Sequence, residues 1–157
     1  MPSTADLIDH NEMLPSCSLQ FRTFGRKRVM SGVISTIACY EDNALIKRRL
    51  SDPGNGMVLV VDGGGSLRCA LIGDVIAGLG AENGWAGVVV YGAVRDADLL
   101  DNMDFCVKAL GTNPRKSGKT AEGSVDIPVS FGDVTFRPGE YVYSDRDGIV
   151  ITKQPFG

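Results

Sequence analysis

The sequence predicts an α/β protein whose C-terminal third is rich in β-structure, folded as one domain over residues 1–157. Two short, continuous apolar runs, residues 57–61 and 86–91, have the length and composition of strands buried on both faces. Helical patterns lie between these runs, and from residue 124 onward short β segments alternate with Gly and Pro turns. A chain of 157 residues is long enough to bury a sizeable core.

The N-terminal part of the chain is predicted to hold one helix and one long strand. Ser3 through Asp6 resembles a capping box with Asp in the place of Glu, which predicts a short helix to about Asn11. Residues 25–28 indicate a turn. Residues 29–40 are rich in β-branched side chains and predict a strand.

The next segment is predicted to contain a helix, a strand and a loop. Asp42 is expected to cap a helix over residues 43–50, because Asp is a favoured N-cap residue and a Pro-Gly breaker follows at Pro53. The strand at residues 57–61 then runs into the glycine-rich loop 62–66. Residues 67–72 show no pattern that assigns them.

A second helix and strand follow this loop. Residues 74–83 predict a helix, and an Asn-Gly turn leads from it into the strand at residues 86–91. Residues 95–102 predict a short helix and residues 105–110 a further strand. The loop at residues 111–123 is expected to be exposed. The remaining β segments are residues 124–131, 134–136, 141–144 and 148–152.

Composition and charge exclude several classes of protein. The net charge of −3 and the pI near 5.1 give no overall field for direct binding of nucleic acid. The basic runs at residues 26–28 and 47–49 are interpreted as solvated surface. No apolar stretch approaches the roughly 18 residues that span a membrane, and the N-terminus has no signal-peptide pattern, so no membrane contact is expected.

The cysteines and the single histidine do not indicate a zinc site. Cys17, Cys39, Cys69 and Cys106 are widely spaced, without a Cys-x-x-Cys pair, and His10 is the only histidine. We interpret the cysteines as reduced thiols, mostly in the core, of a cytoplasmic protein.

Two short polar motifs, Gly73-Asp74 and Arg95-Asp96, carry the strongest functional signal. Twenty residues that predict one helix and one buried strand separate Asp74 from Arg95, so both motifs can reach the same edge of a sheet. Carboxylates beside an arginine suit a divalent metal and an anionic substrate. The alternative is structural: Asp74 and Asp96 as helix caps, and Arg95 in a surface ion pair.

Three other features leave more than one interpretation open. The loop 62–66 follows a buried strand and could cradle an anion, or it is a tight turn; it matches neither nucleotide-binding fingerprint. Trp85 is interpreted as a packing anchor rather than a ligand contact. Asp145 and Asp147 indicate a turn between strands more simply than a calcium site.

Together these motifs resemble one known family, that of the regulator of ribonuclease activity A and the 4-hydroxy-4-methyl-2-oxoglutarate aldolases. The resemblance runs from about Thr4 to Thr152. The stretches that recur in the family in this order are Glu41-Asp42-Asn43, residues 60–68 (VVDGGGSLR), Gly73-Asp74, Asn83-Gly84-Trp85, residues 92–96 (GAVRD), residues 109–112 (ALGT) and residues 145–148 (DRDG).

The resemblance implies an α/β/β/α sandwich of the swivelling-domain type, with mixed sheets, that assembles as a homotrimer or a dimer of trimers. The aldolase branch carries Asp, twenty residues, then Arg-Asp, and Asp74, Arg95 and Asp96 match this pattern. The branch that binds and inhibits ribonuclease E can lack these aspartates. Longer aldolases also have a C-terminal extension that supplies an acidic group to a neighbouring subunit, and the sequence to Gly157 does not include it.

The function implied is a divalent-metal-dependent lyase, a class II aldolase that cleaves 4-hydroxy-4-methyl-2-oxoglutarate-type substrates to pyruvate, with oxaloacetate decarboxylase activity. The alternative is a non-enzymatic regulator that binds and inhibits ribonuclease E. The family was formerly described as a demethylmenaquinone methyltransferase, but apart from the loop 62–66 nothing here indicates binding of S-adenosylmethionine.

The expected site residues divide by role. Asp96 is expected to bind Mg²⁺ or Mn²⁺, and Asp74 to hold water beside the metal. Arg95 is expected to pair with the keto oxygen or the carboxylate of a small α-keto acid. The pyruvyl carboxylate is expected to bind the backbone amides near Gly73, Asp74, Val75 and Ile76.

Overall fold

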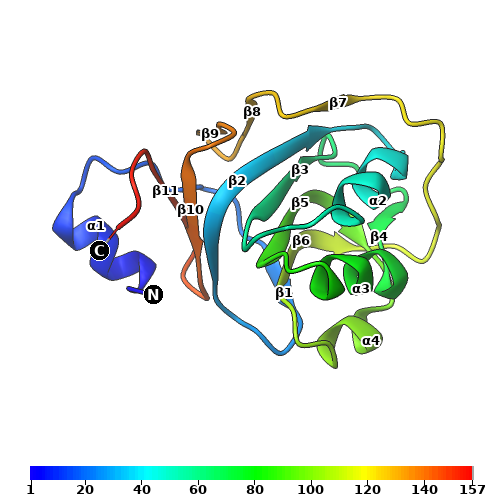
Figure 1. Ribbon diagram of the computed structural model, residues 1–157, viewed down its shortest axis with the longest axis horizontal. Coiled ribbons are helices and arrows are strands. Elements are labelled where there is room, and N and C mark those ends of the chain that lie inside the picture. Colours follow the sequence, from blue (N-terminus) through cyan, green and yellow to red (C-terminus); the bar gives the residue numbers. More distant parts are fainter. Residues whose placement is uncertain (157) are drawn as a thin grey trace.

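The computed structural model describes residues 1–156 and is an α/β/β/α sandwich (Figure 1). The helices are α1 (Thr4–His10), α2 (Ala44–Leu50), α3 (Asp74–Glu82) and α4 (Ala97–Asp101). The strands of the main sheet are β1 (Arg22–Phe24), β2 (Met30–Ala38), β3 (Val58–Asp62), β4 (Ala70–Ile72), β5 (Gly87–Val94), β6 (Val107–Thr112), β7 (Ser124–Val125), β10 (Tyr141–Ser144) and β11 (Ile149–Thr152). Two more strands, β8 (Val129–Phe131) and β9 (Val134–Phe136), pair only with each other.

The long strand β2 belongs to both β layers. Its second half, from Ile34 to Ala38, pairs in parallel with β3, whereas its first half, from Met30 to Val33, pairs antiparallel with β10. The strand order is β1-β6-β5-β3-β2-β10-β11, so the sheet folds over at β2. The parallel strands β2, β3, β5 and β6 form one layer, and β10 and β11 form the other.

Three clusters of buried apolar side chains separate the four layers. Alternate residues of one strand belong to different clusters: Val58 and Val60 face the second sheet layer, while Leu59 and Val61 face helices α2, α3 and α4. A third, smaller cluster, with Leu7 at its centre, lies between β10–β11 and α1 (Figure 1). A strand buried on both faces must be apolar throughout, which is why the run at residues 57–61 was recognisable.

Most predicted elements are confirmed within one or two residues. Helix α1 begins after Ser3, whose hydroxyl oxygen accepts a hydrogen bond from the Asp6 amide (3.0 Å), as the capping box predicted. The prediction that Asp42 is the N-cap of α2 is wrong, because Asn43 holds that position. The Asp42 carboxylate accepts a bond from the Ala44 amide (3.2 Å), but it also binds a distant loop, as described below.

The structure differs from the prediction mainly at short strands. Residues 124–131 form two strands, β7 against β2 and β8 against β9, instead of one. Strands β1 and β4 were not predicted, because strands of three residues are specified by their partners, β6 and β5, more than by their own composition.

Three other predictions concern buried or polar side chains. Trp85 is 4% exposed and its Nε1 donates to the Asp52 carbonyl (3.0 Å), so it is a packing anchor. The Asp145 carboxylate accepts bonds from the Thr4 amide (2.8 Å) and hydroxyl (2.7 Å), at the turn between β10 and β11. All four cysteines are free, and no helix in residues 1–156 is long and apolar enough to cross a membrane.

Candidate functional site

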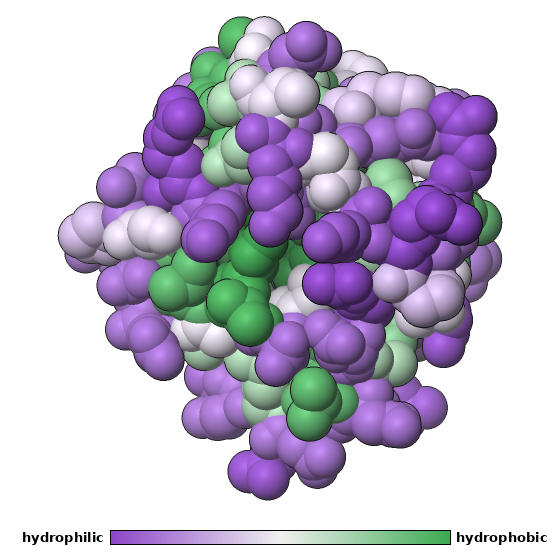
Figure 2. All heavy atoms as spheres, turned by 90° about the vertical axis from the view of Figure 1, so that its right-hand side faces the viewer, coloured by the Kyte–Doolittle hydropathy of each residue, from purple (hydrophilic) through white to green (hydrophobic). Residues whose placement is uncertain are grey.

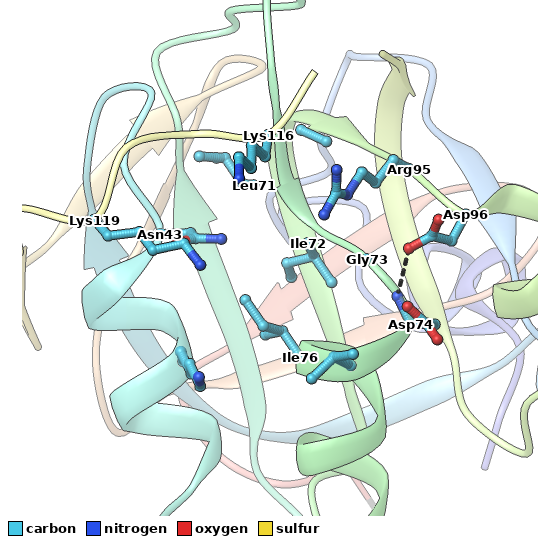
Figure 3. A pocket seen from close by; sticks show the side chains of 13 residues that line it. Asn43, Leu71, Ile72, Gly73, Asp74, Ile76, Arg95, Asp96, Lys116 and Lys119 are labelled. Carbon is cyan, nitrogen blue, oxygen red and sulfur yellow. Dashed lines mark hydrogen bonds between the residues drawn. The ribbon is translucent and has the colours of Figure 1, made fainter. Parts of the chain in front are cut away.

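A pocket of about 200 Å³ lies where β4 ends and α3 begins, and both polar motifs line it (Figure 3). Strand β5 lies beside β4 in parallel and delivers Arg95 and Asp96 from its carboxyl end. The expected convergence of the two motifs at one sheet edge is therefore what the structure shows. The residues that line the pocket are Asn43, Lys47, Ala70, Leu71, Ile72, Gly73, Asp74, Val75, Ile76, Arg95, Asp96, Lys116 and Lys119.

Asp96 caps helix α3 from outside that helix. Its Oδ2 accepts a hydrogen bond from the Asp74 amide (3.1 Å), while Gly73 is the N-cap residue and contributes no side chain. The interpretation of Asp74 as the N-cap is therefore wrong, since Asp74 is the first residue of α3. A Cβ on Gly73 would lie 2.5 Å from Asp96 Oδ2, so glycine is needed here for the close approach of Asp96.

Asp96 also adopts an uncommon backbone conformation. Its φ of 59° and ψ of 43° lie in the left-handed region, which costs an L-residue about 1–2 kcal/mol, although Asp and Asn tolerate it best. The residue makes no side-chain cap bond to its own helix α4. The strained conformation instead turns its half-buried carboxylate toward Gly73 and Asp74.

The first turn of α3 offers backbone donors to the pocket. The first intrahelical bond runs from the Ala77 amide to the Gly73 carbonyl (3.1 Å), so the amides of Val75 and Ile76 have no partner within the helix. A helix N-terminus also carries partial positive charge. These two amides are therefore suited to donate hydrogen bonds to a carboxylate.

Arg95 points its guanidinium into the pocket (Figure 3). The backbone of Arg95 is fixed by a bond from its amide to the Ile72 carbonyl (2.9 Å), and its Nη1 approaches the Pro114 carbonyl at 3.4 Å. No ion pair of Arg95 occurs within residues 1–156, so the structure does not show the alternative of Arg95 in a surface ion pair. The other guanidinium donors remain free for an anionic ligand.

Three lysines complete the pocket, and none of them was predicted from the sequence as a site residue. Lys47 comes from α2, and Lys116 and Lys119 come from the loop after β6. With Arg95 they give the pocket four cationic side chains against two carboxylates, a balance that favours anionic ligands. On this side of the molecule an apolar hollow is rimmed by hydrophilic side chains (Figure 2).

The acidic residues suit a cation that keeps most of its water. No group of three or more His, Cys, Asp and Glu side chains in residues 1–156 could enclose a metal. Asp74 and Asp96 nevertheless lie together, and neither carboxylate is in an ion pair within that part of the chain. Mg²⁺ is commonly held by one or two carboxylates, with water and substrate in its other positions, so these residues fit an open magnesium site.

The glycine-rich loop 62–66 does not contribute to the pocket. The amides of Gly63 and Gly65 both donate to the Tyr91 carbonyl (3.0 and 3.1 Å), and the Gly64 amide donates to Asp62 Oδ1 (2.9 Å). Because these donors are used within the protein, the loop is a tight turn and not a cradle for phosphate.

Comparison with known proteins places the same fold in several solved structures. The profile of the RraA-like family, described as Aldolase/RraA, matches residues 4–151. A crystal structure from Geobacillus kaustophilus HTA426, named S-adenosylmethionine:2-dimethylmenaquinone methyltransferase, is 43% identical, with a TM-score of 0.96, and the match covers 99% of this chain and 97% of that one.

Two further structures carry names that refer to RNA processing. The RNA-processing inhibitor RraA from Thermus thermophilus is 39% identical, with a TM-score of 0.96, over 100% of this chain and 96% of that one. RraAS2 from Streptomyces coelicolor, an unusual member of the RNase ES inhibitor RraA protein family, is 26% identical, with a TM-score of 0.79, over 97% and 80% of the two chains.

Proposed function

The chain belongs to the RraA-like (Aldolase/RraA) family, and we propose that within it this protein is a divalent-metal-dependent aldolase. Its proposed substrates are 4-hydroxy-4-methyl-2-oxoglutarate and related α-keto acids, which it cleaves to pyruvate, with decarboxylation of oxaloacetate as a second activity. The observation that carries this proposal is the meeting of Asp74, Arg95 and Asp96 in one small pocket. A volume of about 200 Å³ lies below the range of about 300–1,000 Å³ typical of drug-sized ligands, which suits an acid of a few carbons.

In the proposed reaction the bond between C3 and C4 of the substrate breaks. The proton of the C4 hydroxyl leaves, C4 becomes a carbonyl, and the electron pair of the broken bond passes to the pyruvyl part as an enolate. That negative charge must be stabilised for the reaction to proceed. Mg²⁺ or Mn²⁺ bound at Asp96 would supply Lewis-acid stabilisation of this charge when present.

The protein's own groups bind and orient the substrate in this proposal. The amides of Val75 and Ile76 donate hydrogen bonds to the pyruvyl carboxylate at the N-terminus of α3. The Arg95 guanidinium donates to the oxygen on which enolate charge develops, an effect worth roughly 10²–10³-fold in rate by analogy with oxyanion-hole donors. The Asp74 carboxylate hydrogen-bonds the water that receives the hydroxyl proton.

The test is an assay of pyruvate release from 4-hydroxy-4-methyl-2-oxoglutarate and from oxaloacetate. We expect activity with Mg²⁺ or Mn²⁺, none with EDTA, and a loss of at least about 10²-fold in Asp96→Asn and Arg95→Met. Asp98→Asn is the matched control, because Asp98 is exposed on α4 and does not line the pocket. Activity that survives both chelation and Asp96→Asn would overturn the proposal.

A second function, regulation of ribonuclease E, is favoured by one specific observation. The chain is 39% identical, over its whole length, to a protein named as an inhibitor of RNA processing. The two functions separate in a ribonuclease E cleavage assay with the wild type and an Asp74→Asn/Asp96→Asn double variant. Inhibition that is equal for both proteins would indicate a regulatory surface outside the pocket, and absence of inhibition would leave the lyase alone.

The remaining proposals follow the same family. We propose a homotrimer, or a dimer of trimers, in the cytoplasm, to be checked by light scattering and cell fractionation. Methyl transfer is not proposed, although one relative carries that name, because the amides of the loop 62–66 are occupied within the protein.

A further inference from the structure

The loop after β6 is fastened across the mouth of the pocket by main-chain hydrogen bonds. The Ala70 amide donates to the Arg115 carbonyl (2.7 Å), so the loop runs beside β4. The Gly118 amide donates to the Glu41 carbonyl (2.8 Å), and the Asn43 amide donates to the Gly118 carbonyl (3.1 Å). These contacts bring the loop against the start of α2.

Asp42 is the side chain that joins this loop to α2. It is only 5% exposed, and its carboxylate accepts bonds from the Thr120 amide and hydroxyl, the Ala121 amide and the Ala44 amide. Burial acts to raise the pKa of the carboxyl, but these hydrogen bonds together hold its pKa below the ordinary value of 3.8. We call these four hydrogen bonds the Asp42 clasp; they stabilise the carboxylate in its charged form and hold the loop against the start of α2.

The clasp determines where two lysines lie. Lys116 and Lys119, on the fastened loop, face the pocket from the side opposite Asp74 and Asp96, with apolar Ile72 between the two sides (Figure 3). Lys47 joins the lysines from α2. The pocket therefore has an acidic end with the α3 amides and a separate end made of ammonium groups.

The lysine end also opens into a second hollow along α2. A groove of about 440 Å³ shares Asn43, Lys47 and Lys119 with the pocket and continues past Arg48. Arg49, the last residue of this basic run, does not take part, because it stacks on Trp85 at 4.9 Å and bonds to Ser35. The basic run at residues 47–49 was interpreted from the sequence as solvated surface. In the structure Lys47 lines the pocket, Arg48 lines the groove, and Arg49 packs on Trp85.

We propose that Lys47, Lys116 and Lys119 form a second anion-binding subsite, that Asp42 positions it, and that it takes the distal carboxylate of an α-keto diacid. The inference rests on the proposed function, because the α-keto end is assigned to Arg95 and the α3 amides. Three ammonium groups around one small opening attract a carboxylate more strongly than a single exposed pair does. The subsite makes the protein selective for diacids over monoacids of equal length.

The test compares two acids that differ only in the distal group and that the proposed reaction does not cleave. 2-Oxoglutarate and 2-oxopentanoate each have five carbons, and only the first carries a distal carboxylate. Titration calorimetry with Mg²⁺ should give a dissociation constant about tenfold lower for 2-oxoglutarate. Lys116→Gln and Lys119→Gln should each reduce this ratio several-fold, because they weaken the binding of 2-oxoglutarate much more than that of 2-oxopentanoate.

Controls separate positioning from folding and this inference from the proposed function. Asp42→Asn should lower the ratio as the lysine substitutions do, and Thr120→Ala removes one donor of the clasp if Asp42→Asn fails to fold. Lys153→Gln, at an exposed lysine that does not line the pocket, should change nothing. Equal binding of the two acids, or a ratio unchanged in the lysine variants, overturns the subsite alone, whereas no binding of either acid overturns the proposed function with it.

Discussion

Asp96 has two roles, one structural and one in the proposed reaction, and both use its carboxylate. Its carboxylate caps α3 through the Asp74 amide, and in the proposed reaction it also holds a cation. Its left-handed backbone is what turns the side chain away from its own helix α4 and toward Gly73. A residue that caps its own helix would have a β-region backbone, so the conformation fits a carboxylate that serves the neighbouring helix and the pocket.

The close approach of Asp96 to Gly73 predicts that adding a single methyl group at position 73 disturbs the site. In Gly73→Ala the new Cβ would lie 2.5 Å from Asp96 Oδ2 and 3.3 Å from Arg95 Cγ, so both side chains must move. The φ of Gly73 is −127°, which alanine adopts freely, so the backbone itself is not strained. We expect pyruvate release to fall at least about tenfold, because small misplacements of catalytic groups have large effects on rate.

A glycine within α3 itself supplies the control. A Cβ on Gly78, inside α3, would meet only Met103 Cε at 3.8 Å, so Gly78→Ala should raise the free energy of unfolding by about 0.5–1 kcal/mol. Urea unfolding and the pyruvate assay measure both variants. Full activity in Gly73→Ala would show that the close approach to Asp96 is not needed for the reaction.

At the scale of elements, sequence periodicity was sufficient where an element is long or buried on both faces. Strands β3 and β5 and helices α1 and α3 were predicted because their apolar spacing or their capping residues lie within one continuous stretch of sequence. Strands β1 and β4 have three residues each, and their strand conformation depends on β6 and β5 lying beside them. No local pattern carries that information.

The candidate site divides in the same way. Asp74, Arg95 and Asp96 could be predicted to meet because one helix and one buried strand separate the two motifs, and such a unit returns the chain to the same edge of a sheet. Lys116 and Lys119 could not, because their direction depends on the Asp42 clasp, which joins residues far apart in the sequence. The one available signal was the number of lysines in an otherwise irregular loop.

Trp85 gives a prediction about how elements are held together. Its ring belongs to the core cluster that also contains residues of α2 and α3. The Arg49 guanidinium carbon lies 4.9 Å from the centre of the ring, and Nε1 donates a hydrogen bond to the Asp52 carbonyl. Trp85→Phe keeps an aromatic ring but leaves that carbonyl without its donor, and we expect a loss of about 1–3 kcal/mol in the free energy of unfolding. Because Trp85 does not line the pocket, pyruvate release at 25 °C should stay near the wild-type rate.

Chemical denaturation and the pyruvate assay distinguish these effects. A Trp85→Phe protein that is as stable as the wild type would show that the hydrogen bond to Asp52 is dispensable. A specific loss of activity in a stable variant would instead favour the ligand-contact interpretation of Trp85.

At the scale of the whole molecule, the outer layer formed by α1 is held by a small apolar cluster and by polar contacts at one turn. Leu7 packs with Tyr143 and Val150, and the first and the last of the described residues lie on this side (Figure 1). The turn between β10 and β11 also meets Lys108, a buried lysine of β6 whose ammonium donates to the Asp145 and Gly148 carbonyls. Asp145 therefore connects α1 to the two sheet layers.

This connection gives a prediction of acid sensitivity. Burial acts to raise the pKa of the Asp145 carboxyl, but hydrogen bonds from Thr4 and Asp147 together hold its pKa below the ordinary 3.8. A carboxyl whose pKa is lower in the folded than in the unfolded state stabilises the fold above pH 3.8. That stability is lost as the pH falls from 3.8 through the folded-state pKa, because the unfolded chain then binds more protons.

Comparison with Asp145→Asn isolates this contribution from that of Asp42, whose carboxyl pKa is also lowered. The variant should be less stable than the wild type at pH 7, and the difference should shrink as the pH falls from 3.8 through the lower folded-state pKa, because below that pKa Asp145 is protonated in both folded and unfolded wild type. Because the lost bonds hold Thr4, hydrogen exchange at pH 7 should speed up first in α1, while amides of β3 and β5 keep their protection. A difference in stability that is constant from pH 7 down to pH 2 would mean that the Asp145 charge does not attach α1, and that the Leu7 cluster alone holds this layer in place.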